Sequence, residues 1–183
     1  MGEFSRIYKT AFSDVELGRL WERFVDCNRD QVIFYNRPPM DGKDFVRFCH
    51  ADDVHLWVIP FREEVAGIFW LTEHEGKTAR CHFGQLPTKQ KRTAGRIPVQ
   101  LGFGRFCLAS ALWTHDGHGY LVDRLLGLTP LTNRPAIRFI GRLGARLIGV
   151  VPGGCYFHAK DRNEDGAATY YTRETAPLDW CRI

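Results

Sequence analysis

The stretch Asn133-Arg-Pro-Ala-Ile-Arg-Phe-Ile-Gly-Arg-Leu-Gly144 decides the fold of this chain. Its spacing predicts an amphipathic helix over residues 133–143. The apolar face of that helix consists of Ala136, Phe139, Ile140 and Leu143. Thr132 or Asn133 can cap its start, and Pro135 is tolerated in the first turn. Gly144 follows the last apolar position, where a left-handed helix stop favours glycine.

Apolar runs at residues 120–128 and 145–151 flank this helix and predict a strand–helix–strand unit with short connections. The unit resembles the second half of the GNAT acyltransferase superfamily, in which a helix with the pattern N-x-x-A, followed by a glycine eleven residues after the asparagine, precedes a late strand. Asn133, Ala136 and Gly144 match that register. The resemblance implies the binding of an acyl-coenzyme A.

The composition indicates a globular protein with one large core. The chain has 183 residues, of which 44% are hydrophobic and 13% aromatic, and we expect a single domain over residues 1–183. No apolar run is long enough to span a bilayer, and residues 1–6 lack the apolar stretch of a leader, so we expect a cytoplasmic protein that is not in a membrane. The six widely spaced cysteines lack a Cys-x-x-Cys motif, which favours free thiols and argues against a metal site.

The order of the other elements agrees with the resemblance. Ser13-Asp-Val-Glu16 is a capping box that starts a helix near residues 14–27. The full set of expected elements is a strand at 6–12, helices at 14–27 and 41–49, strands at 55–61, 65–72 and 79–86, a helix at 98–113, a strand at 120–128, the helix at 133–143, and strands at 145–151 and about 166–173. This order, β-α-α-β-β-β-α-β-α-β-β, is that of the GNAT fold. We therefore predict an α/β class fold with a mixed, predominantly antiparallel sheet in which two central strands splay apart.

The segment after the third strand of the meander is a candidate site for the phosphates of the cofactor. Between Lys89 and Arg96 it carries four cations, and it precedes a helix, whose first amides and dipole favour an anion. The superfamily carries [Q/R]-x-x-G-x-[G/A] at this place; Arg92, Gly95 and Ile97 fall into that register, although Ile97 is not small. The candidate residues for acetyl-CoA from this region are Gln85, Leu86, Lys91, Arg92, Gly95, Arg96 and Ile97.

Asn133 and Arg138 complete the predicted cofactor site. An asparagine before a helix is commonly only a cap, whereas in the resembling family this position often contacts the pantetheine arm. Arg138 can reach the phosphates from the same helix, or it is simply a solvated helix arginine. The net charge of +4 fits an anionic ligand. It is too small to indicate a nucleic-acid binder, for which the basic loop and exposed aromatic residues are the supporting features.

The catalytic residues of the resembling family are not all present in this sequence, because two family positions differ. The tyrosine that often donates to sulfur, seven residues after the asparagine, is Ile140 here, and the aromatic residue after the glycine is Ala145. Tyr120 is our candidate donor, with Tyr156, Tyr170 and Tyr171 as alternatives. As the base that takes the proton of the amine we consider His82, with Glu73, Glu75 and Asp123 as alternatives.

The resemblance implies an acetyl-CoA-dependent N-acetyltransferase that transfers an acetyl group to an amine on an unidentified small or protein acceptor, as a monomer or homodimer. The alternative is a catalytically degenerate GNAT-like module that binds an acyl-CoA or a protein partner. Ile97, Ile140 and Ala145 favour that alternative.

Overall fold

The computed structural model describes residues 3–36, 38–115 and 117–182. Met1 and Gly2, on which the expectation about a leader partly rests, lie outside these ranges. The described strands form one mixed sheet in the order β1-β2-β3-β4-β5-β7-β6. They are β1 (Ile7–Tyr8), β2 (His55–Phe61), β3 (Glu64–Glu75), β4 (Thr78–Gln85), β5 (Arg124–Pro130), β6 (Arg146–Phe157) and β7 (Arg162–Tyr171).

Five α-helices are seen in the described residues: α1 (Asp14–Asp26), α2 (Asp30–Ile33), α3 (Gly42–His50), α4 (Val99–Leu112) and α5 (Arg134–Arg142). Short 3-10 helices occur at Lys9–Ala11, His158–Lys160 and Leu178–Arg182. No helix in the described part of the chain is long and apolar enough to cross a membrane. The six cysteines are unpaired.

The predicted element order is confirmed, with corrections at several boundaries. The first strand is wrong beyond Tyr8, because the chain turns there into the 3-10 helix Lys9–Ala11. The short helix α2 was not expected from the sequence. The strand predicted from residue 120 begins only at Arg124, and β6 and β7 are longer than predicted because they form an extended hairpin.

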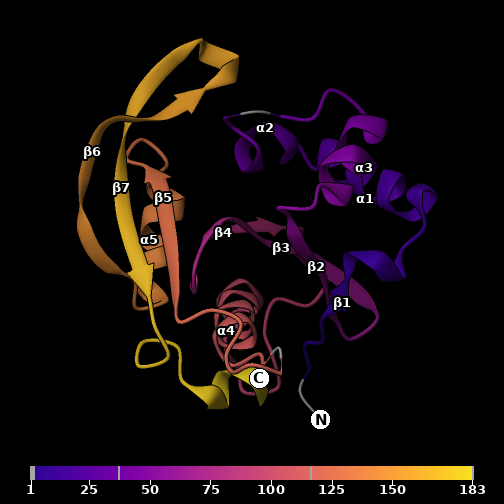
Figure 1. Cartoon of the computed structure of the whole chain (residues 1–183). Helices are drawn as coiled ribbons and strands as arrows, with labels where there is room; N and C mark the ends of the chain where they lie inside the picture. The colour runs from indigo at the N-terminus through magenta and orange to yellow at the C-terminus, as the bar shows by residue number, and fades with distance from the viewer. Residues whose placement is uncertain (1–2, 37, 116, 183) are drawn as a thin grey trace.

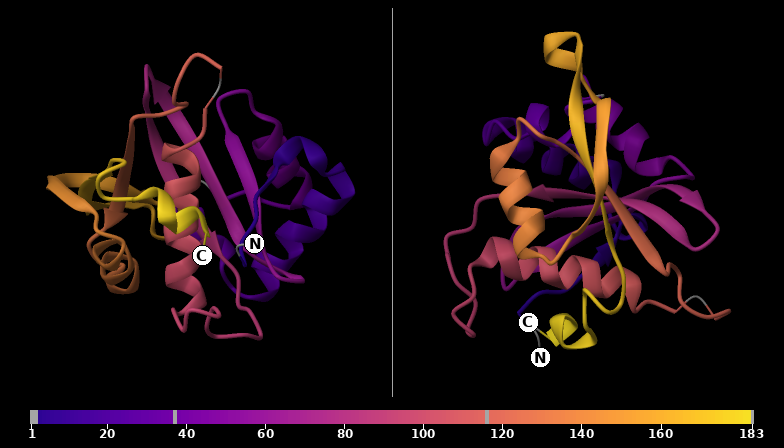
Figure 2. Two further views of the ribbon diagram at one scale, coloured as in Figure 1. Left: turned by 90° about the horizontal axis from the view of Figure 1, so that it is seen from below. Right: turned by 90° about the vertical axis from the view of Figure 1, so that its left-hand side faces the viewer.

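The helices cover both faces of the sheet (Figures 1 and 2). On one face, α1 and α3 pack with Leu56, Val58 and Ile68 of the sheet in one apolar core. On the other face, α4 packs with Ile59, Leu71 and other sheet residues in a second core, which also holds Leu143 at the end of α5. The sheet therefore separates an α1–α3 face from an α4–α5 face.

The helix that the sequence singled out forms as predicted. The side chain of Asn133 accepts a hydrogen bond from the amide of Ala136 at 3.2 Å and so caps α5. Gly144 has a φ of +75°, the left-handed stop that favours glycine. The predicted capping box at the start of α1 is also present, with the amide of Ser13 donating to Glu16 at 2.8 Å.

Candidate functional site

The central feature of the sheet is the parallel pair β4 and β5, which parts after a short ladder. The pairing runs from Thr78 opposite Arg124 to Arg80 opposite Leu126. Beyond this point β4 continues beside β3 as far as Gln85, and β5 continues beside β7 as far as Pro130. Within the described strands, the two facing edges therefore carry backbone groups without a partner strand, although such groups normally need hydrogen bonds. The expected splayed strand pair is confirmed.

A cavity of about 370 Å³ occupies the opening between the two strands. Its walls come from the parted strands β4 and β5, the neighbouring strand β7, helix α5, the segment around α2, and one residue of α4. Representative lining residues are His82, Phe83, Gly127, Asn133, Ile140 and Tyr35. Among the described residues that line it there is no aspartate or glutamate, and Arg29 supplies its one cation. The cavity is therefore mostly apolar, with a few polar groups, as is typical of small-molecule sites.

The residues that line the cavity come from both faces of the sheet. On the α1–α3 face, the ring of His82 stacks on Trp70, a member of that core, with 4.9 Å between ring centroids. On the α4–α5 face, Phe83 contacts Phe139 of α5 edge to face at 5.6 Å, and Tyr171 belongs to that core. A ligand in the cavity can therefore meet groups presented from both sides of the sheet.

His82 lies in the cavity wall, on the parted section of β4. Its Nε2 atom is 2.9 Å from the hydroxyl of Thr72, within hydrogen-bonding distance. Burial, together with the charge of Arg80, lowers the pKa of His82 to about 3. The imidazole is therefore neutral near pH 7. Since an efficient base has a pKa near the working pH, this value weakens the case for His82 as a base. That role stays a prediction.

The other two predicted catalytic residues lie outside the lining of the cavity. Glu73 is exposed, and its carboxylate forms an ion pair with Arg80 at 2.8 Å. Tyr120 precedes β5, at the paired end of the β4–β5 ladder, because the strand begins later than the sequence indicated. Its ring contacts His115 and lies 4.0 Å from the guanidinium of Arg173. The structure therefore does not bring Tyr120 together with His82.

The basic turn before α4 differs from the open phosphate cradle that the sequence suggested. The amides of Thr93 and Arg96 donate to carbonyl groups within the turn at 2.9 and 2.8 Å, and the amide of Ala94 donates to Glu3. The helix itself starts later, at Val99. Three amides near Gly95 are therefore already hydrogen-bonded, two within the turn and one to Glu3, whereas the sequence led us to expect unpaired amides there.

Two cationic side chains of this turn also donate hydrogen bonds to nearby carbonyl groups. The ammonium of Lys91 donates to the carbonyl of Thr88 at 2.8 Å, and the guanidinium of Arg92 donates to that of Arg96 at 2.6 Å. Neither side chain lines the cavity, and neither do Gly95, Arg96 and Ile97. Phosphate binding by these residues stays a prediction.

The remaining predicted cofactor residues divide into two groups. Gln85 and Asn133 line the cavity, and the amide group of Gln85 donates to the carbonyl of Gln100 at 3.3 Å. Leu86 is buried in the core on the α1–α3 face instead. Arg138 is exposed on α5, outside the cavity lining.

Two tyrosines in the cavity wall were not among our leading candidates. Tyr35 follows α2, and its hydroxyl donates to the carbonyl of Leu128 on β5 at 3.2 Å. Tyr171, at the end of β7, is 1% exposed, and its hydroxyl has no hydrogen-bond partner in the described part of the chain. Both reach the cavity through long-range packing, for which the local sequence carries no signal beyond the residue type.

Comparison with known proteins supports the fold. Neither a protein-family model nor a curated protein matches this sequence. Among solved structures, the chain is similar to a spermidine N-acetyltransferase from Vibrio cholerae in complex with CoA and spermine, with a TM-score of 0.71 and 10% identity over 95% of this chain and 98% of that one. A probable GNAT-family acetyltransferase from Chromobacterium violaceum has a TM-score of 0.70 and 13% identity, over 96% of this chain and 85% of that one.

A GCN5-related N-acetyltransferase from Brucella melitensis is also similar, with a TM-score of 0.65 and 18% identity over 95% of this chain and 76% of that one. Because all three cover nearly the whole of this chain, the likeness extends over both halves of the parted sheet. The chain therefore has the fold of the GNAT acetyltransferases, a mixed α/β fold with a mostly antiparallel sheet.

Proposed function

We propose that this protein is a divergent member of the GNAT superfamily that binds acetyl-CoA between β4 and β5 and transfers the acetyl group to an amine. The observation that carries the proposal is the cavity at the point where the β4–β5 ladder ends. A pantetheine arm contains two amide groups. Such an arm can hydrogen-bond to the unpartnered strand edges as a short additional strand would.

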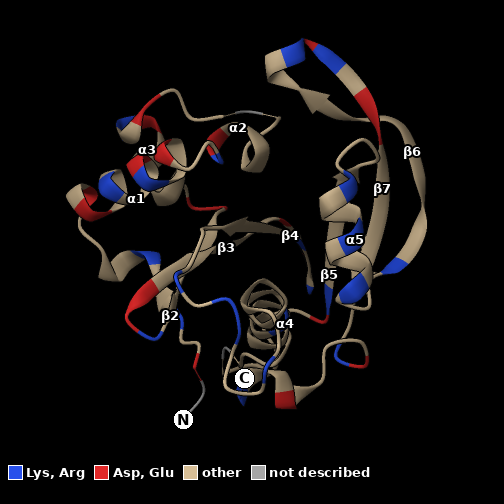
Figure 3. Cartoon of the chain, turned by 180° about the vertical axis from the view of Figure 1, so that it is seen from behind, with Lys and Arg blue, Asp and Glu red and all other residues tan. Residues whose placement is uncertain are grey.

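The charges near the cavity support an anionic ligand. Arg134, Arg138 and Arg142 lie four residues apart along α5, so they form one exposed stripe, which Figure 3 shows beside the parted strands. Within the described residues these three arginines have no ion-pair partner. The phosphates of a coenzyme whose arm entered the cavity past Asn133 would be attracted to this stripe.

Acetyl transfer requires that the cavity hold the thioester, admit the amine and provide an acceptor for the amine's proton. Holding the thioester beside the amine replaces a bimolecular encounter, which is the main gain from a shaped cleft. The amine enters from the α1–α3 face, where Arg29 and Tyr35 line the cavity. His82 is the one histidine among the described lining residues, and its imidazole is the proposed acceptor of the amine's proton, although a pKa of about 3 makes it a weak base near pH 7.

Isothermal titration calorimetry with acetyl-CoA, paired with cavity-filling variants, tests the proposal. Ala136→Phe places a ring in the cavity wall, whereas Ile137→Phe adds the same ring to the same helix at a position outside the lining. We expect saturable heat with the wild type, a loss of affinity of more than tenfold in Ala136→Phe, and nearly unchanged affinity in Ile137→Phe. If the wild type gives no heat with acetyl-CoA or CoA, or if both variants bind equally, the proposed site is wrong.

A catalytically degenerate binding module is the second candidate, favoured by Ile140 in place of the usual tyrosine. An assay for CoA release with a panel of primary amines separates the two functions. Release that depends on an amine supports the enzyme, whereas stabilisation by acetyl-CoA without release supports the module.

A further inference from the structure

The buried hydroxyl of Tyr171 is an unusual feature of the cavity. The side chain is 1% exposed, and its oxygen has no hydrogen-bond partner in the described part of the chain. Buried polar groups are nearly always paired, because leaving one unpaired destabilises the fold, so an exception calls for an explanation. Tyr171 also lines the cavity, where a bound ligand can supply the missing partner.

Each of the other five tyrosines either has a hydroxyl that is already hydrogen-bonded or lies outside the cavity. Tyr35, the second cavity tyrosine, already donates to the carbonyl of Leu128. The hydroxyls of Tyr8 and Tyr156 are hydrogen-bonded to His55 and Asp161. The rings of Tyr120 and Tyr170 lie against the guanidinium groups of Arg173 and Arg124. Among the described residues, Tyr171 is thus the one tyrosine that both lines the cavity and has an unpaired hydroxyl.

The position of Tyr171 relative to α5 explains what it can replace. Ile140, at the place where the resembling family often has a tyrosine, lines the same cavity and cannot donate a hydrogen bond. Tyr171 reaches the cavity on this α4–α5 face from strand β7, where it lies opposite Leu125 of β5. The two side chains therefore face one space from two different elements.

We propose that Tyr171 is the catalytic residue that donates its hydroxyl hydrogen to the leaving sulfur of acetyl-CoA, in place of a tyrosine on α5. In this step the amine nitrogen bonds to the carbonyl carbon, the carbon–sulfur bond breaks, and its electron pair goes to sulfur. Sulfur takes the hydrogen from Oη, and the proton lost by the amine returns to the phenolate through solvent. This inference rests on the proposed function, because it needs CoA in the cavity.

The Tyr171 hydroxyl is protonated near pH 7, as a hydrogen donor must be, although its raised pKa makes it a weaker acid than an ordinary phenol. Burial raises the pKa of the Tyr171 phenol, and the Cys81 thiol adds to the rise. The hydroxyl therefore keeps its hydrogen near pH 7. A hydrogen bond to a charged form stabilises that form, so contact with Oη lowers the pKa of a bound thiol.

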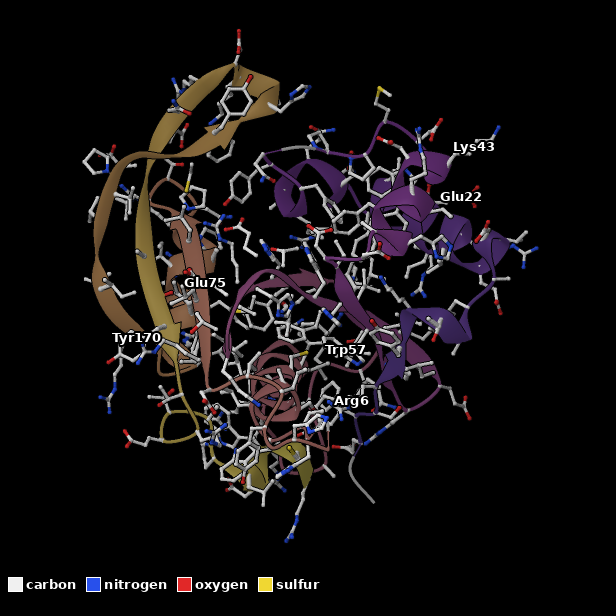
Figure 4. All side chains as sticks on the ribbon, viewed as in Figure 1. Arg6, Glu22, Lys43, Trp57, Glu75 and Tyr170 are labelled. Atoms are coloured by element: carbon white, nitrogen blue, oxygen red, sulfur yellow. The ribbon has the colours of Figure 1, made fainter. Side chains whose placement is uncertain are left out.

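The test compares Tyr171→Phe with Tyr170→Phe. Neighbouring residues of a strand point to opposite faces, and Tyr170 lies at the outer side of the lower end of β7 (Figure 4), so its variant controls for losing one hydroxyl from this strand. The first readout is the pKa of the thiol of bound CoA, followed by thiolate absorbance against pH. We expect a higher thiol pKa in Tyr171→Phe than in the wild type and in Tyr170→Phe.

The second readout is turnover of acetyl-CoA with the amine that the wild type uses best. We expect kcat to fall about 100-fold in Tyr171→Phe, the usual order for losing a proton donor, with a nearly unchanged Kd for CoA. The Tm of Tyr171→Phe should equal or exceed that of the wild type, because the variant removes an unpaired buried group.

The outcomes separate this inference from the proposed function. If Tyr171→Phe binds CoA but shows the thiol pKa and kcat of the wild type, the inference fails and the acyl-CoA site stands. A clear fall in Tm also overturns it, because the hydroxyl would then be bonded within the fold. If the wild type does not bind CoA, both fail.

Discussion

Gly104 on α4 allows α5 to approach closely, and Gly104→Ala is a direct test of how this packing shapes the cavity. A Cβ atom added at Gly104 would lie 2.6 Å from Phe139 Cζ and 2.8 Å from Leu143 Cδ1. Carbon atoms prefer separations of about 3.5–4.0 Å. Leu143 is fully buried and has no free space into which it can retreat, whereas Phe139, which packs against Phe83, can move only towards the cavity that it lines.

The expected loss of stability follows from two opposing effects. Overpacking a core costs about 1–3 kcal/mol. Replacing glycine by alanine within a helix gains about 0.5–1 kcal/mol. Because the added Cβ atom would lie within 3.0 Å of two side chains, we expect the upper part of the overpacking range, about 2–3 kcal/mol. The net loss for Gly104→Ala is then about 1–2.5 kcal/mol, which in a domain of this size lowers Tm by about 2–10 °C. The affinity for acetyl-CoA should fall with it, because Phe139 and Ile140 of α5 line the cavity.

Gly141→Ala is the matched control on α5, since a Cβ atom there meets no heavy atom within 4 Å. Its helix propensity should raise Tm by about 1–4 °C. Thermal unfolding followed by circular dichroism, together with calorimetry, measures both variants. The two shifts in Tm are expected to have opposite signs. An unchanged or higher Tm in Gly104→Ala would refute the reasoning about the α4–α5 contact.

Three further predictions concern single positions. Because burial lowers the pKa of His82 from 6.5 to about 3, the unfolded chain binds more protons between these values, so stability should fall as pH drops from about 6.5 towards 3. Denaturant titrations at several pH values should show a smaller fall in His82→Gln, and an identical fall would contradict the buried imidazole. Asn133→Ala should lose about 0.5–2 kcal/mol with the cap, whereas Asn133→Ser should restore the Tm; a CoA affinity that stays low in Asn133→Ser identifies a contact with the cofactor beyond the cap. Because the described cavity lining holds no carboxylate, spermidine should be no better an acceptor than a neutral-tailed primary amine, and a tenfold preference in kcat/KM for spermidine would disprove this.

The sequence predicted the fold well, because the signals for its elements are local. The capping box at Ser13, the cap at Asn133 and the stop at Gly144 each act within a few residues, and all three form. The short helix α2 was missed, because four residues are too few to show helical periodicity.

The site was predicted only in part, because its geometry depends on distant pairing. Asn133 and His82 line the cavity as their places in the family pattern implied. Tyr120 lies outside β5 because residues 120–123 precede the strand. The sequence did not reveal this boundary, because the apolar run that predicts the strand already begins at Tyr120. Tyr171 becomes important through its place opposite Leu125 and near α5, and neither relation can be read from the sequence around it.

The short β4–β5 ladder has a mechanical consequence. The three pairs from Thr78 to Arg80 are the only rungs that join strands β1–β4 to strands β5–β7 in the described sheet. The sheet therefore consists of two sections that are joined by this short ladder and by the core on the α4–α5 face. A ligand that hydrogen-bonds to the free edges of both β4 and β5 would connect the two sections. It would then slow the exchange of backbone amide hydrogens in both strands together.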